Sequence, residues 1–156
     1  MRKLGLMLGL GLAGVVYGSE VEILPEITRH NIEEQTSEDF SVVFIYSSNP
    51  TTTDSIAGMQ RGEDIILDLN TKYGDYSRRF LRFDTQKLAD ELGSSSGVTS
   101  YLQENFEINK RPSILFFCNG NQVYKLNGSA PKSDEKIPQA KAYLGSKIIE
   151  FSNECK

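Results

Sequence analysis

The sequence predicts an α/β fold in which a mixed sheet lies between two layers of helices. Three observations favour this three-layer class. The run "FSVVFIYSS", residues 40–48, is almost continuously apolar and β-branched, as is typical of a central strand covered on both faces. Segments with strand-like and helix-like spacing then alternate, which favours parallel strands joined by helices. Near the end, "SILFFCNGNQVYKL" has the pattern of a β-hairpin, and a helical pattern follows it.

Composition sets the limits of the functional classes. The chain has 156 residues, enough for one domain with an ordinary core, and it is 38% hydrophobic and 24% charged. Its formal net charge of −4 argues against nucleic acid as the main partner, because phosphate binding needs a basic surface. Two cysteines without a CxxC motif and a single histidine do not supply the ligands of a zinc site. We therefore expect no metal and no cofactor.

The first residues have the layout of a secretory signal peptide. Arg2 and Lys3 precede an apolar run, and a loose small-x-small pattern places the expected cut near Gly18–Ser19. The expected organisation is a signal peptide at 1–18, an N-terminal segment at 19–39 and one domain at 40–156. The mature chain then holds no membrane span and is located in the ER lumen or outside the cell. A mitochondrial presequence and an uncleaved anchor are the alternatives.

Before the central strand, residues 21–24 are expected to form a short strand. Thr28 is expected to cap a short helix that runs to about Gln35. After the central strand comes the polar stretch "SSNPTTTD", which favours a turn and the start of a helix. This first half therefore predicts two strands and one short helix before the first long helix.

The long helix is predicted at residues 54–73. Thr53 or Asp54 is its expected cap and Gly74 its expected end, while Gly58 and Gly62 oppose it by about 1 kcal/mol each. The apolar positions are spaced so that they share one face of the helix. They are Ile56, Met59, Ile66, Leu69 and Tyr73.

The second half of the chain repeats the alternation. "RRFLRFD" predicts a strand with Phe80 and Leu81 on opposite faces, and "TQKLADELG" predicts a short helix capped by Thr85 and ended by Gly93. "GSSSGVT" is expected to be a flexible insert, and "SYLQENFEI" a further short helical turn. The last helix, with Ser133 as its expected cap, has the cleanest period of the chain. Its apolar positions are Ile137, Ala140, Leu144, Ile148 and Phe151.

This order of elements, together with particular motifs, resembles the thioredoxin fold. The most specific match is "RPSILFFCNGNQVYKLNGSAPK", in which a proline opens an apolar strand and an Asn-Gly hairpin leads to a bend before the last helix. "SVVFIYSS" and "RFLRFDTQKLADEL" are similar to the preceding strands and helix of that family. The resemblance spans residues 40–151. Combined with the signal-like start, it suggests the branch related to protein disulfide isomerase.

The resemblance implies a site from which the redox chemistry has been lost. The proline of this family follows a cis peptide bond, so Arg111–Pro112 is expected to be cis. The two family cysteines align near Pro50 and Thr53, and neither side chain forms the thiolate that attacks a disulfide. The resemblance instead implies a groove for an extended peptide, with no catalytic residue. The residues expected to line it are Ser48, Asn49, Pro50, Thr51, Thr52, Thr53, Arg111 and Pro112.

The two cysteines lie elsewhere in this fold. Cys118 flanks the hairpin turn, and the last helix is expected to return Cys155 toward the same turn, so one arrangement is a disulfide between them. The other is a buried Cys118 thiol with Cys155 free or paired to another molecule. Asn127-Gly128-Ser129 is also a sequon for N-glycosylation if the chain enters the ER.

The sequence therefore predicts a thioredoxin-like protein that binds protein or extended peptide without oxidoreductase activity, as a binding module or an accessory subunit in the secretory pathway. One alternative is a single-thiol or glutathione-dependent redox enzyme that uses Cys118 or Cys155. The other is a structural subunit of an organellar membrane complex. The identity of the partner and the oligomeric state are not encoded in any motif.

Overall fold

The structure, a computed structural model, describes residues 20–155, so the predicted signal peptide lies outside the described residues. Five strands form one sheet in the order β1-β3-β2-β4-β5. β2 (Phe40–Tyr46) lies at its centre, parallel to β3 (Arg78–Asp84) and antiparallel to β4 (Ser113–Cys118). The edges are β1 (Glu26–Ile27), parallel to β3, and β5 (Asn121–Leu126), antiparallel to β4. The predicted mixed sheet is confirmed.

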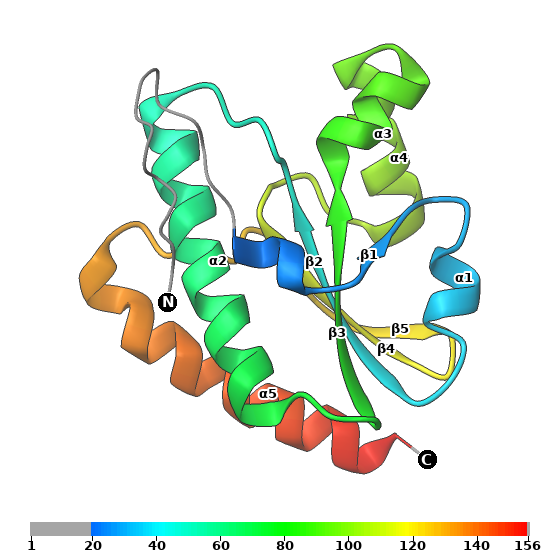
Figure 1. Ribbon diagram of the computed structural model, residues 1–156, viewed down its shortest axis with the longest axis vertical. Coiled ribbons are helices and arrows are strands. Elements are labelled where there is room, and N and C mark those ends of the chain that lie inside the picture. Colours follow the sequence, from blue (N-terminus) through cyan, green and yellow to red (C-terminus); the bar gives the residue numbers. More distant parts are fainter. Residues whose placement is uncertain (1–19, 156) are drawn as a thin grey trace.

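Helices cover both faces of the sheet. α2 (Thr53–Tyr73) and α5 (Ile137–Glu154) lie side by side on one face (Figure 1). The other face packs against α1 (Ile32–Gln35), α3 (Thr85–Leu92) and α4 (Ser95–Phe106). The expected three-layer arrangement is therefore present, with a hairpin and a final helix at its C-terminal end.

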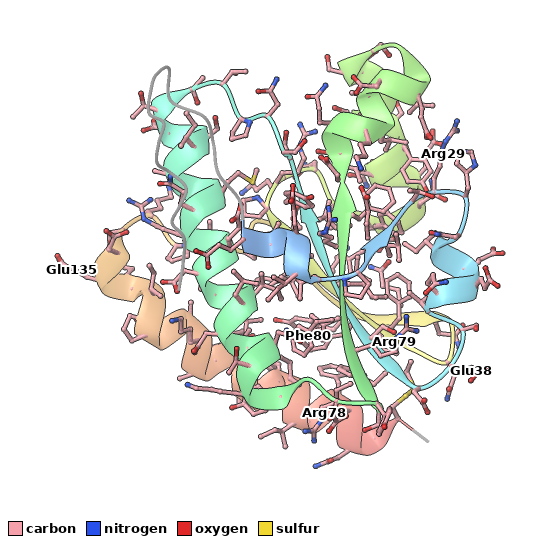
Figure 2. The ribbon with its side chains drawn as sticks, in the orientation of Figure 1. Arg29, Glu38, Arg78, Arg79, Phe80 and Glu135 are labelled. Atoms are coloured by element: carbon pink, nitrogen blue, oxygen red, sulfur yellow. A yellow bond between two sulfur atoms is a disulfide. The ribbon has the colours of Figure 1, made fainter. Side chains whose placement is uncertain are left out.

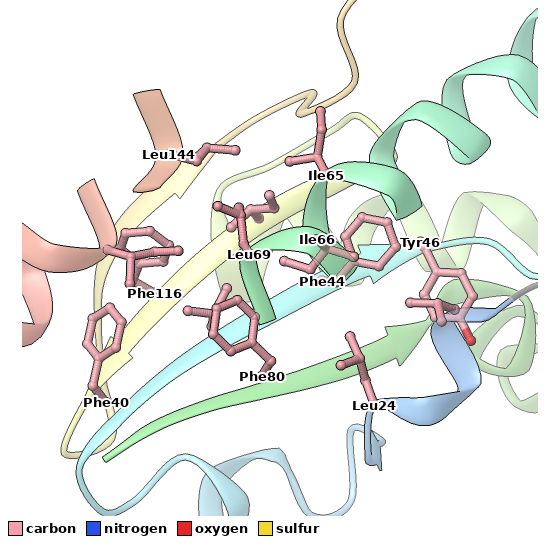
Figure 3. Packing of buried hydrophobic residues seen from close by; sticks show 14 of the residues in the cluster. Leu24, Phe40, Phe44, Tyr46, Ile65, Ile66, Leu69, Phe80, Phe116 and Leu144 are labelled. Atoms are coloured by element: carbon pink, nitrogen blue, oxygen red, sulfur yellow. The ribbon is translucent and has the colours of Figure 1, made fainter. Parts of the chain in front are cut away.

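The larger core lies between the sheet and the α2–α5 layer. Phe44 and Phe116 are fully buried from the two central strands, and Ile66 and Leu69 meet them from α2 (Figure 3). Leu144 completes the contact from α5. Side chains from β2 face both cores, as expected for a strand whose seven residues are all buried.

The alternation predicted for β3 is also observed. Phe80 packs in the core under α2, whereas Leu81 and Phe83 pack on the opposite face. Figure 2 shows Arg78 and Arg79 at the start of the same strand. Arg78 donates a hydrogen bond to Ser152 of α5, and Arg79 donates two to Gln35 of α1. These two arginines are therefore held by partners on the two helix layers.

The first predicted strand is wrong. Residues Glu20–Ile23 form a 3₁₀ helix, η2, and the short strand β1 comes only after Pro25. The predicted strand, residues 21–24, has two buried apolar side chains, Val21 and Leu24, and so short a pattern fits either structure. α1 likewise begins later than predicted, with Asn31 at its N-cap position. The Asn31 side chain instead accepts a hydrogen bond from the Thr28 N–H, 2.8 Å long, which closes the turn before the helix.

The serine-rich segment predicted to be a flexible insert begins a helix. Ser94 is the N-cap of α4, and its hydroxyl accepts a hydrogen bond from the Gly97 N–H. Serines favour this position because they satisfy the unpaired N–H groups of a first turn. Val98 is then buried against the sheet. The composition of the segment indicated mobility. The segment is helical instead, because Ser94 caps the first turn and Val98 packs in the core.

Two other predicted caps are corrected. Asp84, the last residue of β3, caps α3 by accepting a hydrogen bond from Gln86 N–H, while Thr85 donates from its hydroxyl to the carbonyl of Tyr46. Ser133 precedes a 3₁₀ turn (η3, Asp134–Lys136) without a capping hydrogen bond from its side chain. Gly93 ends α3 as predicted, with a left-handed backbone at φ 76°.

The C-terminal part closes on the hairpin. Asn119 and Gly120 form the turn between β4 and β5 with positive φ angles of 48° and 89°. Beside this turn, Cys118 and Cys155 form a disulfide with a sequence separation of 37. The bond joins the end of α5 to the sheet, and it confirms the first of the two arrangements considered for the cysteines.

Candidate functional site

The candidate groove lies at one end of the central strands, where β2 ends and β4 begins. Ile45 is paired with Ser113, so Tyr46 and Pro112 are the next residues on the two strands. The Arg111–Pro112 peptide bond is cis. The loop of residues 47–52 therefore leaves β2 beside the segment that carries Arg111, and the structure brings the two predicted halves of the groove together.

The loop after β2 is held by hydrogen bonds at its base and is exposed beyond it. Ser48 N–H donates to the Asp84 carboxylate over 3.0 Å, and Asn49 N–H donates to the Ser47 hydroxyl over 3.3 Å. The side chains of Asn49, Thr51 and Thr53 are exposed, and Pro50 is half-buried. The exposed polar groups of the loop are therefore available to a partner.

Thr52 has a structural role that the sequence assigned to its neighbours. Its hydroxyl accepts a hydrogen bond from Ser55 N–H over 3.0 Å, and the Ser55 hydroxyl accepts one from Thr52 N–H over 3.0 Å. This reciprocal pair is a capping box, which satisfies two N–H groups at the start of α2. Thr53 is the first helical residue and Asp54 the second, so neither is the cap. The hydroxyl and N–H of Thr52 are therefore engaged in starting α2, although the sequence placed this residue in the groove.

Pro112 and Arg111 differ sharply in exposure. The Pro112 ring is buried under α2, and its carbonyl accepts a 2.7 Å hydrogen bond from Ser129 N–H. Arg111 is exposed, and among residues 20–155 neither its backbone N–H nor its C=O has a hydrogen-bond partner. Its side chain donates to the Thr85 hydroxyl over 3.3 Å. The backbone of Arg111 thus offers one donor and one acceptor beside the loop.

Gly62 explains how the helix comes so close to this segment. A Cβ atom on Gly62 would lie 2.7 Å from the Pro112 Cγ and 3.4 Å from a ring carbon of Phe44. Only a glycine lets α2 pack directly on the proline. The glycine that weakens the helix by propensity therefore permits the close contact between α2 and Pro112.

Two features that might have filled the groove lie elsewhere. Tyr46 is 2% exposed and belongs to the core, where its hydroxyl accepts a 2.9 Å hydrogen bond from Arg82. Burial raises the pKa of the Tyr46 phenol above its usual value, so it stays neutral at physiological pH. The serine-rich segment at residues 94–97 forms the N-cap and the first residues of α4.

The disulfide is remote from this groove. Cys118 pairs with Phe40 at the start of β2, whereas the loop follows the end of that strand. Six residues of extended strand separate the two ends by about 20 Å. Both cysteines of the chain are in the bond, so neither presents a free thiol to a substrate near Pro112.

Asn127, the predicted glycosylation residue, is exposed and holds the segment that leads to Arg111. Its Oδ1 accepts hydrogen bonds from the N–H groups of Asn109 and Lys110, each 3.0 Å long. Its Nδ2, the atom that a glycan would modify, donates to the Asn109 side chain over 2.9 Å. Ser129 of the same sequon is 5% exposed. The amide thus has a structural role, and its glycosylation stays a prediction.

Sequence reasoning missed Glu63, a carboxyl group buried in α2. Glu63 is 6% exposed, and its Oε2 is buried without a hydrogen-bond partner. Burial raises the pKa of the Glu63 carboxyl to about 8. A signal was present in the sequence, because Glu63 falls four residues after Met59 and three before Ile66, within the apolar stripe of the helix.

The full-length chain is expected to lose stability as the pH rises through neutrality. The carboxyl of Glu63 binds a proton in the folded state up to about pH 8, whereas it loses it near pH 4.3 when unfolded. Between these two pH values the folded state therefore binds more protons than the unfolded state. The contribution of Glu63 to the free energy of unfolding is fully present below about pH 4 and falls by up to about 1.4 kcal/mol per pH unit above it. Urea unfolding between pH 5.5 and 7.5 measures this slope. The variant Glu63→Gln should show a slope smaller by one proton; an unchanged slope would show that Glu63 is already ionised.

Comparisons with known proteins agree with the architecture. No family model matches the sequence, and no curated protein matches it. Among solved structures, mitochondrial thioredoxin 3 from Saccharomyces cerevisiae aligns over 85% of this chain and 99% of its own, with a TM-score of 0.54 and 16% identity. The fold is thioredoxin-like. At this level of identity the likeness concerns the fold alone.

Other thioredoxin-like structures match to a similar degree. Human ERp44 aligns over 83% of this chain and 30% of its own, with a TM-score of 0.52 and 18% identity. A structure solved for the thiol-resolving mechanism of yeast mitochondrial 1-Cys peroxiredoxin aligns over 85% and 99%, with a TM-score of 0.51 and 14% identity. These thioredoxin-like neighbours thus include proteins of the ER and of mitochondria.

Two further properties concern the residues that the structure describes. None of the helices within residues 20–155 combines the length and apolar character needed to cross a bilayer. Over the same residues, no three His, Cys, Asp or Glu side chains are placed so that they could hold a metal ion together.

Proposed function

We propose that this thioredoxin-like protein binds extended polypeptide without redox chemistry. The observation that carries the proposal is the backbone of Arg111, an exposed residue, whose N–H and C=O have no partner among the described residues. An extended peptide pairs with such a donor and acceptor as a strand pairs with a sheet edge. The exposed side chains of Asn49, Thr51 and Thr53 then lie beside the bound backbone and add polar contacts.

The residue types at the loop favour binding over thiol exchange. Disulfide exchange requires a thiolate, and Pro50 and Thr53 provide none. A threonine nucleophile would need an adjacent base, and the loop contains no histidine or lysine. Cys118 and Cys155 form a disulfide about 20 Å from the loop. A single-thiol enzyme needs a free cysteine, and both cysteines are engaged in this bond.

We further propose that the protein works in the secretory pathway, in the manner of the branch related to protein disulfide isomerase. The signal-like first 18 residues and an oxidised cysteine pair support this location, because disulfides persist in oxidising compartments. The likeness to mitochondrial thioredoxin keeps a mitochondrial location as the alternative. Microscopy of the full chain with a C-terminal tag distinguishes the two.

Peptide binding is expected to depend on the loop side chains and on main-chain pairing. A binding sequence is first selected from a displayed library of random unfolded peptides with the purified protein, and its affinity is measured by fluorescence anisotropy. The triple variant Asn49→Ala, Thr51→Ala and Thr53→Ala should weaken binding at least tenfold, about 1.4 kcal/mol. Methylating the peptide nitrogen that pairs with the Arg111 carbonyl should weaken it similarly, because it removes a hydrogen-bond donor.

A matched control is Thr99→Ala, an exposed threonine on α4 outside the proposed groove. It should leave the affinity unchanged. If the triple variant binds as tightly as the natural protein, the loop serves only to begin α2, and the proposed groove is wrong. If no N-methyl position in the peptide affects binding, recognition does not use the Arg111 backbone.

A further inference from the structure

A hollow on the surface of α2, separate from the proposed peptide groove, has an acidic lining. This acidic trough has an open volume of about 590 Å³. The α2 residues that line it recur three and four positions apart, so they share one face of the helix. η2 lies beside α2 and contributes Glu20 to the lining (Figure 1). The α2 residues are Gln60, Glu63, Asp64, Leu67, Asp68 and Thr71.

Glu63 is a carboxyl group of the trough without a counter-ion among residues 20–155. It is 6% exposed, and its Oε2 atom is buried without a hydrogen-bond partner. The Lys141 ammonium on α5 lies 3.4 Å from Asp64 and 3.7 Å from Asp68. Lys72 lies 3.3 Å from Asp68, so both lysines are engaged by other carboxylates. Because an unpaired buried carboxyl group is costly, the trough has a place for a cation that these lysines do not fill.

The chemistry of the trough favours an organic cation over a metal ion. Calcium and magnesium take about six oxygen ligands, and no three His, Cys, Asp or Glu side chains of the described part of the chain are placed to hold a metal together. A guanidinium group needs only one carboxylate, to which it donates two parallel N–H bonds, and it is more weakly hydrated than an ammonium group. The methylene stem of an arginine would also cover Leu67, which is half-buried in the trough.

We propose that the acidic trough binds an arginine side chain of a partner protein, whose guanidinium group is the counter-ion of Glu63. Glu20 contributes a second carboxylate from η2, and the exposed Gln60 side chain contributes an amide oxygen as a further acceptor. The formal net charge of −4 also favours a basic partner, because complementary charges raise the rate of encounter. The trough shares no residue with the peptide groove, so the proposal is independent of peptide binding there.

Binding should remove the proton from Glu63. Burial alone raises the pKa of the unpaired carboxyl group to about 8, so it is mostly neutral at pH 7. The guanidinium group keeps its charge at this pH, and an opposite charge in contact lowers the pKa of an acid. Formation of the pair at pH 7 therefore releases about one proton to the solvent. The other charged groups at the trough are Glu20 of η2, Asp64, Asp68 and Lys72 of α2, and Lys141 of α5.

The probe is a fluorescein-labelled peptide of eight arginines, with a peptide of eight lysines as the comparison. Its affinity for the full-length protein is measured by fluorescence anisotropy at pH 7 and physiological salt. Calorimetry in two buffers with different heats of ionisation gives the number of protons released on binding. The variant Glu63→Gln removes the carboxyl group with little change of shape, and Glu104→Gln, exposed on α4, is the matched control. Urea unfolding establishes that both variants are folded.

The natural protein should bind the arginine peptide with release of about one proton. Glu63→Gln should weaken binding about tenfold and abolish the release, as expected for the loss of a charged hydrogen-bond partner. Glu104→Gln should change the affinity less than about twofold and keep the release. Equal losses of affinity in the two variants, or no proton release from the natural protein, would overturn the proposal. Equal affinity for the lysine peptide would overturn the assignment to a guanidinium group.

A third variant separates the acidic trough from the peptide groove. The triple variant Asn49→Ala, Thr51→Ala and Thr53→Ala should bind the arginine peptide like the natural protein, whatever its effect on the selected extended peptide. Loss of arginine-peptide binding in this variant would place the arginine at the peptide groove and would overturn the proposal. Failure of the trough is thus distinct from failure of the proposed function.

Discussion

Removal of the Cys118–Cys155 disulfide should lower the free energy of unfolding by about 4 kcal/mol. The two residues are 37 apart in sequence, and in the chain-entropy model a cross-link over a loop of this length restricts the unfolded chain by about that amount. The bond also ties the end of α5 to the start of the hairpin turn, so its loss frees the helix that covers Phe116. Urea unfolding of the natural protein and of the double variant Cys118→Ala, Cys155→Ala measures the difference.

The control separates the cross-link from the packing of the two side chains. Natural protein treated with dithiothreitol keeps both sulfur atoms and loses only the bond, so it should show most of the same loss. The peptide affinity of the reduced protein should stay unchanged at urea-free conditions, because the bond lies about 20 Å from the proposed groove. Equal unfolding midpoints for oxidised and reduced protein would show that the two thiols are not paired in solution.

The fold was predictable because several independent patterns agree. The buried run of β2, the Asn119-Gly120 hairpin and the period of α5 each specify one element and are compatible in one sheet. The wrong predictions fall where the local pattern was short or ambiguous. Residues 21–24 contain too few positions to distinguish a strand from a 3₁₀ turn, and serines at 94–96 suit a mobile linker and a helix cap equally.

The candidate site was only partly predictable. Motif spacing and the resemblance placed the loop and Arg111–Pro112 at the same end of the two central strands, and the register agrees. They did not reveal that Pro112 is buried while the Arg111 backbone is unpaired, because both facts depend on how α2 lies on the strand ends. Glu63 was missed for a similar reason. A single glutamate in an apolar stripe is recognised as buried only when the helix is seen against its neighbours.

The two glycines of α2 should respond in opposite ways to substitution, although the sequence treats them alike. Helix propensity favours alanine over glycine by about 1 kcal/mol at either position. At Gly58 the nearest neighbour of an added Cβ is Ala130, 4.0 Å away, so Gly58→Ala should stabilise the protein by up to about 1 kcal/mol. This variant is the matched control.

At Gly62 the added Cβ would lie 2.7 Å from the Pro112 Cγ and 3.2 Å from its Cβ. The proline is a rigid ring held in the backbone and cannot turn aside, so α2 must move away from the sheet edge. We expect Gly62→Ala to destabilise by about 1–2 kcal/mol in spite of its better propensity, and Gly62→Val by about 3 kcal/mol, as for overpacked cores. Thermal and urea unfolding give these values.

The same displacement should reach the proposed groove. Pro112 is covalently joined to Arg111, so a shift of the proline re-aims the one unpaired N–H and C=O on which peptide binding is proposed to depend. Gly62→Ala should therefore weaken peptide binding under conditions where it is still fully folded, whereas Gly58→Ala should not. If Gly62→Ala is stabilising like Gly58→Ala, the helix is not seated on Pro112, and the positioning of Arg111 must have another cause.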